Sequence, residues 1–360
     1  MCFCLIFLSL PQIVNINTMD KETLKQALLK LSESERKELI KELYQETDPY
    51  SKVLDIRRQK LDNKQGSCPH CGSFKYIKYG IDKGSRRYRC KECESTFTEY
   101  TGTWLSRVHK KHFAGDYIRL MNAEKSLDKI KDELGINKKT AFDWRHKILS
   151  GLENSNKGTF QGITESDDTF FLISEKGSRY LNRLPRKRGG TAKKRGISNE
   201  QVAVIVTADR VSEIDMQVAG LGRIKKIDIE KAIGKRVSEQ TILCSDSHVS
   251  YKGFAIDKDI EHHAIRADLK QHVKKKIYHV QKVNSIDSRL KKWIGYQFVG
   301  VSTKYLQKYL NWFRIKEVLK ESNNFIEQFT DSSLGDSNAW NSFKAIPDDF
   351  EKLMQIQTLN

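Results

Sequence analysis

The sequence predicts an α/β protein in which a mixed sheet is covered by helices and preceded by a cysteine ribbon and a helical segment. Two observations carry this prediction. Four of the seven cysteines form two Cys-x-x-Cys pairs within residues 68–93. From about residue 160 onward, five short apolar strand patterns are followed by helical patterns over 283–296 and 303–320. A chain of 360 residues with 38% apolar residues is long enough for two or three domains.

The charge is large and unevenly distributed. The formal net charge is +18, from 64 lysines and arginines against 46 acids. Residues 321–360 hold seven acids and two bases, so residues 1–320 carry +23. This excess favours a polyanionic partner, either a nucleic acid or an anionic membrane surface. No run of 18 apolar residues is present, so we expect no membrane span.

The N-terminal region predicts a small helical arm. The first eight residues are apolar but lack a basic start and a cleavage site. A weak signal peptide is the alternative, but we expect residues 1–18 to be a non-native or disordered start, with folding beginning near Met19. Leucines spaced three and four apart predict a helical hairpin over 19–46. Ser32 followed by Glu35 is typical of a capped start to the second helix.

The strongest motif is Cys68-x2-Cys71 followed by Cys90-x2-Cys93. Two such knuckles brought together by a hairpin supply the four thiolates of a tetrahedral Zn²⁺ site. The spacing therefore predicts a zinc ribbon over 65–100, in a reducing compartment. Four thiolates leave no open position for water, so we expect the zinc to be structural.

The hairpin between the cysteine pairs interleaves cations with aromatic rings. This composition suits contact with phosphate and packing against bases or sugars. Arg87 and Arg89 are the DNA-binding residues that we expect here. The alternative is that the rings cover the ribbon's core and the cations are solvated, and both can hold on opposite faces. The preceding polar residues, 47–66, are typical of a linker.

Residues 105–150 predict a helical segment with a glycine turn. An amphipathic helix over 126–134, a turn at 135–137 and a second helix over 138–149 have the spacing of a helix-turn-helix. The second helix of such a motif can lie in the major groove of DNA. An ordinary helical hairpin is the alternative, because the charged residues here are mixed in sign.

Acidic residues end two of the predicted strands. Glu165 and Asp167 share one face of the strand over 159–173, because strand side chains alternate. Asp246 directly follows the strand over 241–244. Two carboxylates at the ends of neighbouring strands can bridge one or two divalent cations, as phosphodiester cleavage requires. Taken alone, each aspartate is more often a strand-end or turn residue.

A polar helical face within 283–293 can complete such a site. Asn284, Asp287 and Lys291 lie three and four residues apart and share this face. Asn and Asp are suitable metal ligands, and Lys can hold a phosphate as a point charge. The alternative is a solvated helix face with Ile286, Leu290 and Trp293 forming the buried side. The two interpretations concern opposite faces and do not compete.

Residues 183–195 contain seven cations and no acid. We expect so dense a basic loop to become ordered on a phosphate backbone. A solvated surface loop or a localisation-like patch is the alternative. The expected DNA-binding residues are Arg186, Lys187, Arg188, Lys193, Lys194 and Arg195.

Taken together, these motifs resemble one family. The cysteine ribbon, the strand residues 165–171, and the segments 245–248, 279–285 and 300–313 fit it in the expected order over residues 65–318. The chain resembles the bacterial insertion-sequence transposases that join an N-terminal zinc ribbon to a DDE-type catalytic domain, the ISXO2-like family.

The resemblance implies roles for individual residues. Asp167 corresponds to the first catalytic Asp and Asp246 to the second, together holding two Mg²⁺ ions. The third position is often Asn with a Lys after it, which Asn284 and Lys291 match. Relatives often carry Glu where Asp287 stands, so the resemblance leaves open which of Asn284 and Asp287 meets the metal.

The resemblance also implies an RNase H-like fold over 159–318. Two further positions depart from the pattern or leave it open. Asp168 stands where Glu is usual, and Lys292 is a register alternative to Lys291. Residues 321–360 have no counterpart and are expected to form an acidic tail.

The implied function is that of a DNA transposase. Such an enzyme binds the inverted repeats of its element and catalyses Mg²⁺-dependent strand cleavage and strand transfer on double-stranded DNA. We expect a homodimer or larger assembly on DNA, in the bacterial cytoplasm with the nucleoid and away from any membrane. The alternatives are a non-catalytic zinc-ribbon and helix-turn-helix regulator, an inactive transposase remnant and a structural RNA-binding module.

Overall fold

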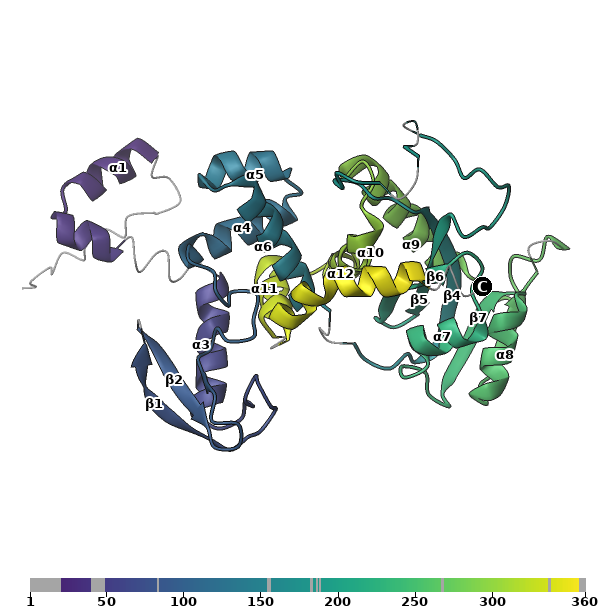
Figure 1. Ribbon diagram of the computed structural model, residues 1–360, viewed down its shortest axis with the longest axis horizontal. Coiled ribbons are helices and arrows are strands. Elements are labelled where there is room, and N and C mark those ends of the chain that lie inside the picture. Colours follow the sequence, from purple (N-terminus) through teal and green to yellow (C-terminus); the bar gives the residue numbers. More distant parts are fainter. Residues whose placement is uncertain are drawn as a thin grey trace, which may run out of the picture.

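A computed structural model describes residues 21–39, 49–82, 84–153, 157–181, 184–185, 187, 189–266, 269–335 and 338–355. The expectation for residues 1–18 lies outside these ranges. Figure 1 shows a ribbon and a helical body on one side and a sheet covered by helices on the other, with the last helix running between them. Within the described residues, no helix has the length and apolar character needed to cross a bilayer.

The N-terminal arm begins with α1 (Lys21–Leu29), followed by helical residues 33–39. The Ser32 backbone N–H donates to Glu35 Oε2 at 2.8 Å, and the Glu35 N–H donates to Ser32 Oγ at 3.3 Å. This reciprocal pair is a capping box, so the predicted capped start is confirmed. The remainder of the predicted hairpin, residues 40–46, lies outside the described residues.

The cysteine ribbon is a three-stranded antiparallel sheet preceded by a helix. Its elements are α3 (Pro49–Asp62), β1 (Tyr76–Asp82), β2 (Ser85–Cys90) and β3 (Thr96–Phe97). The linker prediction for 47–66 is wrong, because α3 buries Leu54 and Leu61 against its neighbours. Composition alone hid these two leucines among many polar residues.

The helical body contains the predicted helix, glycine turn and helix. Its elements are the 3₁₀ turn η2 (Lys111–Phe113), α4 (Ala114–Asn122), α5 (Leu127–Leu134) and α6 (Lys138–Gly151). The Ser126 and Asn137 side chains cap α5 and α6, accepting from N–H groups at 3.2 and 2.8 Å. Gly135 ends α5 at φ 58°, in the left-handed region that favours glycine.

The C-terminal residues form two packed helices, α11 (Phe325–Gly335) and α12 (Ala339–Gln355). α11 packs against α3, α4 and α6, while α12 packs against α6 and the edge strand of the large sheet (Figure 1). Phe329, Leu334 and Ile346 are buried. The expected acidic tail is thus an integral part of the fold, because its apolar residues recur at helical spacing between the acids.

The large sheet has five strands in the order β6-β5-β4-β7-β8. β4 pairs antiparallel with β5, β5 antiparallel with β6, and β4, β7 and β8 run parallel. This arrangement is the expected RNase H-like mixed sheet. The strands are β4 (Gly162–Leu172), β5 (Gln201–Asp209), β6 (Ile214–Leu221), β7 (Thr241–Asp246) and β8 (His262–Ile265).

Helices cover both faces of this sheet. Alternate β5 residues are buried on opposite sides, Val204 and Val206 toward α9 and α10, and Ala203 and Ile205 toward α7 and α8. This double burial explains the continuous apolar run of β5. The helices are α7 (Lys226–Ile233), α8 (Val249–Asp257), α9 (Gln281–Lys292) and α10 (Leu306–Val318), with the turns η4 (Trp293–Gln297) and η5 (Thr303–Tyr305).

Candidate functional site

The four cysteine sulfurs lie at the corners of a compact tetrahedron. Cys68 Sγ is 3.7 Å from Cys93 Sγ, and Cys71 Sγ is 3.6 Å from Cys90 Sγ. All four atoms lie within 4.8 Å of one another. A tetrahedron with Zn–S bonds of ~2.3 Å has edges of ~3.8 Å. The geometry therefore fits a structural Zn²⁺, as the spacing predicted.

The two knuckles repeat one backbone turn. The N–H of Cys68 donates to the Ser73 carbonyl at 2.8 Å, and that of Cys90 to the Ser95 carbonyl at 3.0 Å. The residue after each Cys-x-x-Cys is left-handed, Gly72 at φ 76° and Glu94 at φ 56°. The second turn thus accepts a non-glycine residue at a position that favours glycine.

The interpretation that the ribbon's aromatic residues cover its core is confirmed for one face of the hairpin. Tyr76, Tyr88 and Phe97 are buried together beside the cysteines. Tyr79 is exposed, with the guanidinium groups of Arg87 and Arg89 each 5.7 Å from its ring centroid. Arg87 and Arg89 therefore lie on the solvent face, available for DNA contact, which stays a prediction.

The second helix of the predicted DNA-binding motif is accessible only at its start. Lys138 and Lys139 are exposed, whereas α6 is buried from Trp144 onward apart from Lys147. The packing of α10, α11 and α12 on α6 causes this burial. A DNA groove can therefore receive only the first turns of α6, the part through which helix-turn-helix proteins contact bases.

Asp167, Asp168 and Asp246 are brought together where two parallel strands separate. The pairing of β4 with β7 ends at Glu165 opposite Cys244, and β4 then continues alongside β5 alone. Asp246, at the end of β7, lies beside the unpaired edge of β4. One carboxylate oxygen from each aspartate lies within 4.8 Å of those of the other two.

Asp167 and Asp168 point to opposite faces of the sheet. Asp167 pairs with Val206 and shares its face, toward α9, whereas Asp168 pairs with Ile205 and shares the face toward α7 and α8. Asp168 was not assigned to the site from the sequence. The sequence shows two adjacent acids at this position. Only the pairing register shows that β4 no longer has β7 as a neighbour there.

The carboxylates repel one another in a half-buried setting. Burial, with the charges of Asp168, Asp246 and Asp287, raises the pKa of Asp167 to about 7. Burial and Asp246 raise the pKa of Asp168, although His248 and Arg223 oppose this shift. A divalent cation with oxygen ligands relieves this repulsion, so the residues present fit Mg²⁺ or Mn²⁺.

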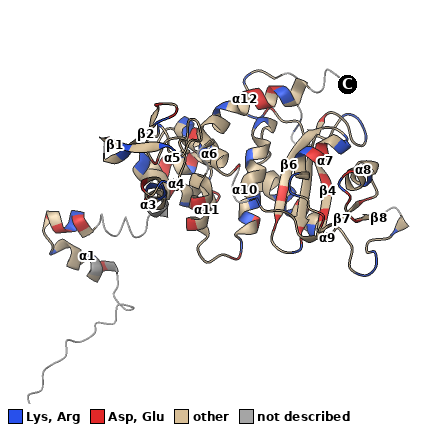
Figure 2. Ribbon diagram, turned by 90° about the horizontal axis from the view of Figure 1, so that it is seen from below, with Lys and Arg blue, Asp and Glu red and all other residues tan. Residues whose placement is uncertain are grey.

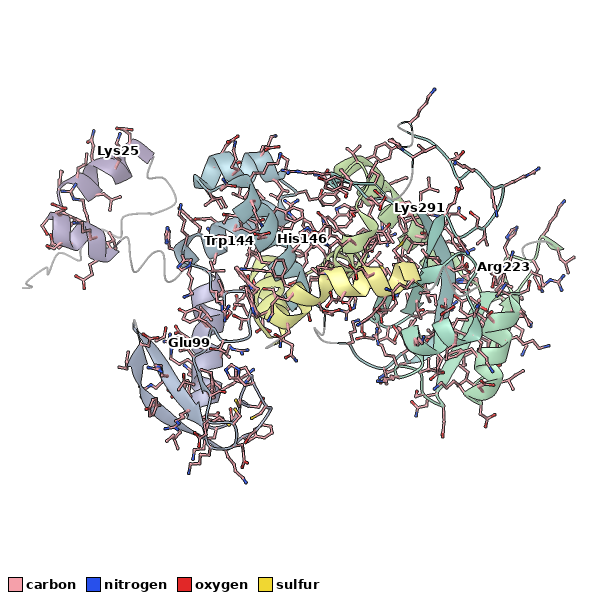
Figure 3. All side chains as sticks on the ribbon, in the orientation of Figure 1. Lys25, Glu99, Trp144, His146, Arg223 and Lys291 are labelled. Atoms are coloured by element: carbon pink, nitrogen blue, oxygen red, sulfur yellow. The ribbon has the colours of Figure 1, made fainter. Side chains whose placement is uncertain are left out.

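α9 directs Asp287 toward this site. Asp287 contributes to the raised pKa of Asp167, and its Oδ1 is buried with no hydrogen-bond partner among the described residues. Asn284 is exposed. Lys291, labelled in Figure 3, lies one turn further along α9, and its Nζ is 2.9 Å from Asp287 Oδ2. Lys292 is also exposed.

Glu165 fixes the start of α9 against the sheet. Its side chain is fully buried, and Oε2 accepts from the backbone N–H groups of Lys282 at 2.7 Å and Val283 at 3.4 Å. Its Oε1 lies 3.2 Å from His279 Nδ1 and 3.5 Å from Arg210 Nη2. Glu165 thereby positions Asp287, about one turn after Val283 in the same helix, a role that the sequence did not suggest.

Tyr251 of α8 lies beneath the carboxylates. Its hydroxyl is 3.4 Å from Ser166 Oγ, which also contacts Thr207 Oγ1 at 2.8 Å. Complete burial raises the pKa of Tyr251 well above its usual value, so the phenol stays neutral. This residue was missed from the sequence, since an aromatic ring on a helix is usually a core residue.

The predicted basic loop is only partly described. Arg186 and Arg188 lie outside the described residues, whereas Lys187, Lys193, Lys194 and Arg195 are exposed. Lysines and arginines are spread over both halves of the molecule (Figure 2). The structure thus leaves the described cations of this loop open to a polyanion, and their role in DNA binding stays a prediction.

Comparison with known proteins points to one family. Residues 159–317 match the model of the ISXO2-like transposase domain. An uncharacterised protein in the transposable element ISH50 of Halobacterium salinarum is 26% identical over 259 residues, which cover 69% of this chain and 84% of the relative.

Two solved structures are weakly similar. A pre-cleavage Mos1 transpososome has 13% identity and a TM-score of 0.25, and the Mos1 strand transfer complex has 12% identity and a TM-score of 0.21. Each comparison covers 93% of this chain and 97% of the other, but similarity this low carries no argument. Residues 159–317, which contain a sheet of the expected topology, are thus similar to the ISXO2-like transposase domain.

Proposed function

We propose that this protein is a transposase that binds the terminal inverted repeats of an insertion sequence and catalyses metal-dependent strand cleavage and strand transfer. The observation that carries the proposal is the meeting of Asp167 and Asp246 at the point where β7 separates from β4, inside the family-matched domain. Had these residues been distant, a DNA-binding protein without chemistry would have been the better conclusion.

Asp167, Asp246 and Asp287 are the residues that we assign to holding two Mg²⁺ ions. When bound, such ions supply Lewis-acid stabilisation of the attacking and leaving oxygens of a phosphodiester. Asp287 is preferred to Asn284 because its buried Oδ1 lacks a partner among the described residues, whereas Asn284 is exposed. Asp168 offers a further carboxylate from the other face of the sheet.

Lys291 is assigned to holding a DNA phosphate. In the structure it neutralises Asp287 at 2.9 Å. Once the Asp287 carboxylate serves as a ligand, the Lys291 ammonium loses part of this attraction and can turn to a phosphate oxygen on the same face. Removing the Lys291 charge should then weaken the positioning of DNA more than the holding of metal.

The remaining parts are assigned to DNA contact. We place the zinc ribbon within 65–100 and the helix-turn-helix within 105–150, with chemistry in 159–318. Arg87, Arg89, the start of α6 and the basic loop would neutralise phosphates, so affinity should fall steeply with salt. Holding two element ends at once requires a homodimer or larger assembly.

The test is cleavage of a supercoiled plasmid that carries the DNA flanking the coding region. Wild-type protein with Mg²⁺ or Mn²⁺ should nick at the element ends, and Asp167→Asn and Asp246→Asn should abolish nicking while leaving affinity for the same DNA intact. Asp257→Asn is the matched control, because this acid is exposed at the end of α8 and pairs with Lys226. Comparing Asn284→Ala with Asp287→Ala identifies the third ligand.

The alternative function is that of a DNA-binding regulator or an inactive remnant. It rests on the four-cysteine ribbon and the capped α5–α6 pair, which need no carboxylate cluster. If the wild-type protein binds the flanking DNA specifically but never cuts it with either metal, this alternative replaces the transposase proposal.

A further inference from the structure

Two nitrogen donors converge beside the carboxylates, on the face of the sheet opposite α9. Arg223 lies in the loop between β6 and α7 and is labelled at the α7–α8 side in Figure 3. His248 is the N-cap residue of α8. Arg223 Nη1 lies 3.4 Å from His248 Nε2. Neither residue has a role in the assignments above.

The helix cap determines which nitrogen of His248 carries hydrogen. His248 Nδ1 accepts from the backbone N–H of Ser250 at 3.3 Å, as an N-cap side chain does. A neutral imidazole has one donor and one acceptor nitrogen, so Nε2 carries the hydrogen. The guanidinium of Arg223 has only N–H donors and no acceptor. Arg223 and His248 therefore direct N–H groups at one another, and among the described residues no acceptor is placed between them.

This donor pair adjoins the carboxylates. The backbone N–H of His248 donates to Asp246 Oδ1 at 3.0 Å, which ties the imidazole to the end of β7. The positive charge of Arg223 acts on Asp168, which faces the same side of the sheet. The pair is thus fixed to the site by one direct hydrogen bond and by its charge.

We propose that Arg223 and His248 together bind a non-bridging oxygen of a DNA phosphate next to the bond that is cut. The ligand is a phosphodiester anion, which supplies the acceptor that both N–H groups lack. This inference rests on the proposed function only for the identity of the DNA, since the donor geometry stands without it.

The proposal gives the two faces of the sheet complementary tasks. Lys291 lies on the α9 face, whereas Arg223 and His248 lie on the face of α7 and α8. A strand that crosses the carboxylates between these faces is held at two phosphates, one on either side of the reacting bond. Two fixed points define the direction of the strand, which in-line displacement requires.

The test measures whether the contribution of a single DNA phosphate to binding depends on Arg223. Binding is measured in Ca²⁺ to duplexes that carry one terminal repeat, with each phosphate near the cut replaced in turn by an uncharged methylphosphonate. Arg223→Ala should weaken binding of the unmodified duplex about tenfold. One methylphosphonate position should weaken wild-type binding by a similar factor and leave the Arg223→Ala affinity unchanged.

Two further variants separate this role from a structural one. His248→Asn retains an N-cap acceptor for Ser250 but removes the Nε2 donor. The methylphosphonate that has no effect on Arg223→Ala should therefore also have no effect on the affinity of His248→Asn. Lys231→Ala removes an exposed cation from α7. Its effect on binding should add to the effect of every methylphosphonate. A ¹⁵N spectrum of His248 should show hydrogen on Nε2 in the free protein.

Additive effects of Arg223→Ala at all phosphates, or hydrogen on Nδ1 of His248, would overturn the proposal. Because the assay measures binding, it decides the matter whether or not the protein cuts DNA. A cleavage-inactive wild type that still shows the coupling refutes the proposed function alone. A cleaving wild type without the coupling refutes this inference alone.

Discussion

The two candidate metal centres differ in how the chain assembles them. The cysteine cluster is complete within residues 68–93 and uses one backbone turn twice. The carboxylate cluster draws on β4, β7 and α9, and its members are ordered only when the sheet and the helix above it have formed. The first centre can be recognised from spacing alone, whereas the second requires the topology.

The centres also differ in how the protein is destabilised when no metal is bound. At the cysteine centre, the surrounding ribbon has only a small aromatic core to hold it together without metal. The carboxylates lie against a large core and repel one another instead. Metal should therefore be necessary for folding at the cysteine centre and should only relieve strain at the carboxylate centre.

The largest effect is expected from loss of one ribbon cysteine. Cys90→Ser replaces a buried zinc ligand at the end of β2, so zinc content should fall from one per chain to nearly none. Structural zinc contributes roughly 10 kcal/mol or more in small domains, so the ribbon should unfold while the large sheet persists. Metal analysis with hydrogen exchange measures both changes.

Cys244→Ala is the matched control for that experiment. Cys244 is also buried, but it lies in β7 and outside the cysteine cluster. Its zinc content should stay at one per chain. A Cys90→Ser protein that keeps its zinc and its exchange protection would remove the distinction drawn between the two centres.

The next largest effect is expected at the carboxylate centre. Asp167→Asn should reduce metal-dependent cleavage by more than about a hundredfold, because a ligand matters more than the outer contacts that orient it. The same change should leave zinc content unaltered. Single-turnover cleavage measures the first effect and metal analysis the second, and loss of zinc in this variant would show that the centres are coupled.

The raised pKa of Asp167 predicts a pH-dependent stability of the zinc-loaded, Mg²⁺-free protein. Its folded-state pKa of about 7 lies above the ordinary value of 3.8, so the folded state holds the proton more tightly. The stability from this group is complete below about pH 4 and is lost as pH rises toward 7 and beyond. Melting temperature should therefore fall between pH 5 and 8.

Asp167→Asn provides the control for the pH experiment. The amide cannot ionise, so the fall in melting temperature between pH 5 and 8 should be smaller in this variant, and at pH 8 it should melt above the wild type. Added Mg²⁺ should stabilise the wild type more at pH 8 than at pH 5. Parallel curves for the two proteins would contradict the raised pKa.

The sequence predicted what depends on local pattern. The spacing of the cysteines predicted the ribbon. Apolar runs such as that of β5 predicted the strands, because a strand buried on both faces must be apolar throughout. The meeting of Asp167 and Asp246 followed from the family resemblance, because Asp246 ends β7 but Asp167 lies in the middle of β4 rather than at the expected strand end. In each case the information lay within a few residues or in a known order of motifs.

The sequence left undecided what depends on tertiary packing. Asn284 and Asp287 share a helical face, and only the rotation of α9, fixed by Glu165, brings Asp287 toward Asp167. The acidic composition of residues 321–360 obscured two helices that are held by contacts with α6. Such outcomes are set by residues distant in sequence, which composition and periodicity do not register.

A smaller effect is expected from Glu165→Gln. The amide keeps the shape of the side chain but removes the charge that faces His279, Arg210 and two backbone N–H groups. Loss of a charged, buried hydrogen-bonding group should lower the free energy of unfolding by about 2 kcal/mol. Cleavage should fall as well, because α9 no longer holds Asp287 in place, and zinc content should not change.

Urea unfolding and cleavage of the same preparation measure these changes. Glu261→Gln serves as the control, since this exposed acid lies near β8 and pairs with His263 rather than with α9. An unchanged cleavage rate in Glu165→Gln would show that the start of α9 is fixed by its apolar face alone.

The smallest effect is expected where α12 joins the helical body. The Lys147 ammonium lies 4.6 Å from the centroid of the Trp340 ring, and the Arg107 guanidinium lies 5.5 Å from it. Trp340→Leu keeps apolar bulk but removes the aromatic face, so stability should fall by about 1 kcal/mol. Lys147→Gln should cost less in the Trp340→Leu background than in the wild type, as a double-mutant cycle in urea measures. Because neither metal centre contains these residues, zinc content and cleavage should both be retained, and a loss of either would show that α12 links the two centres.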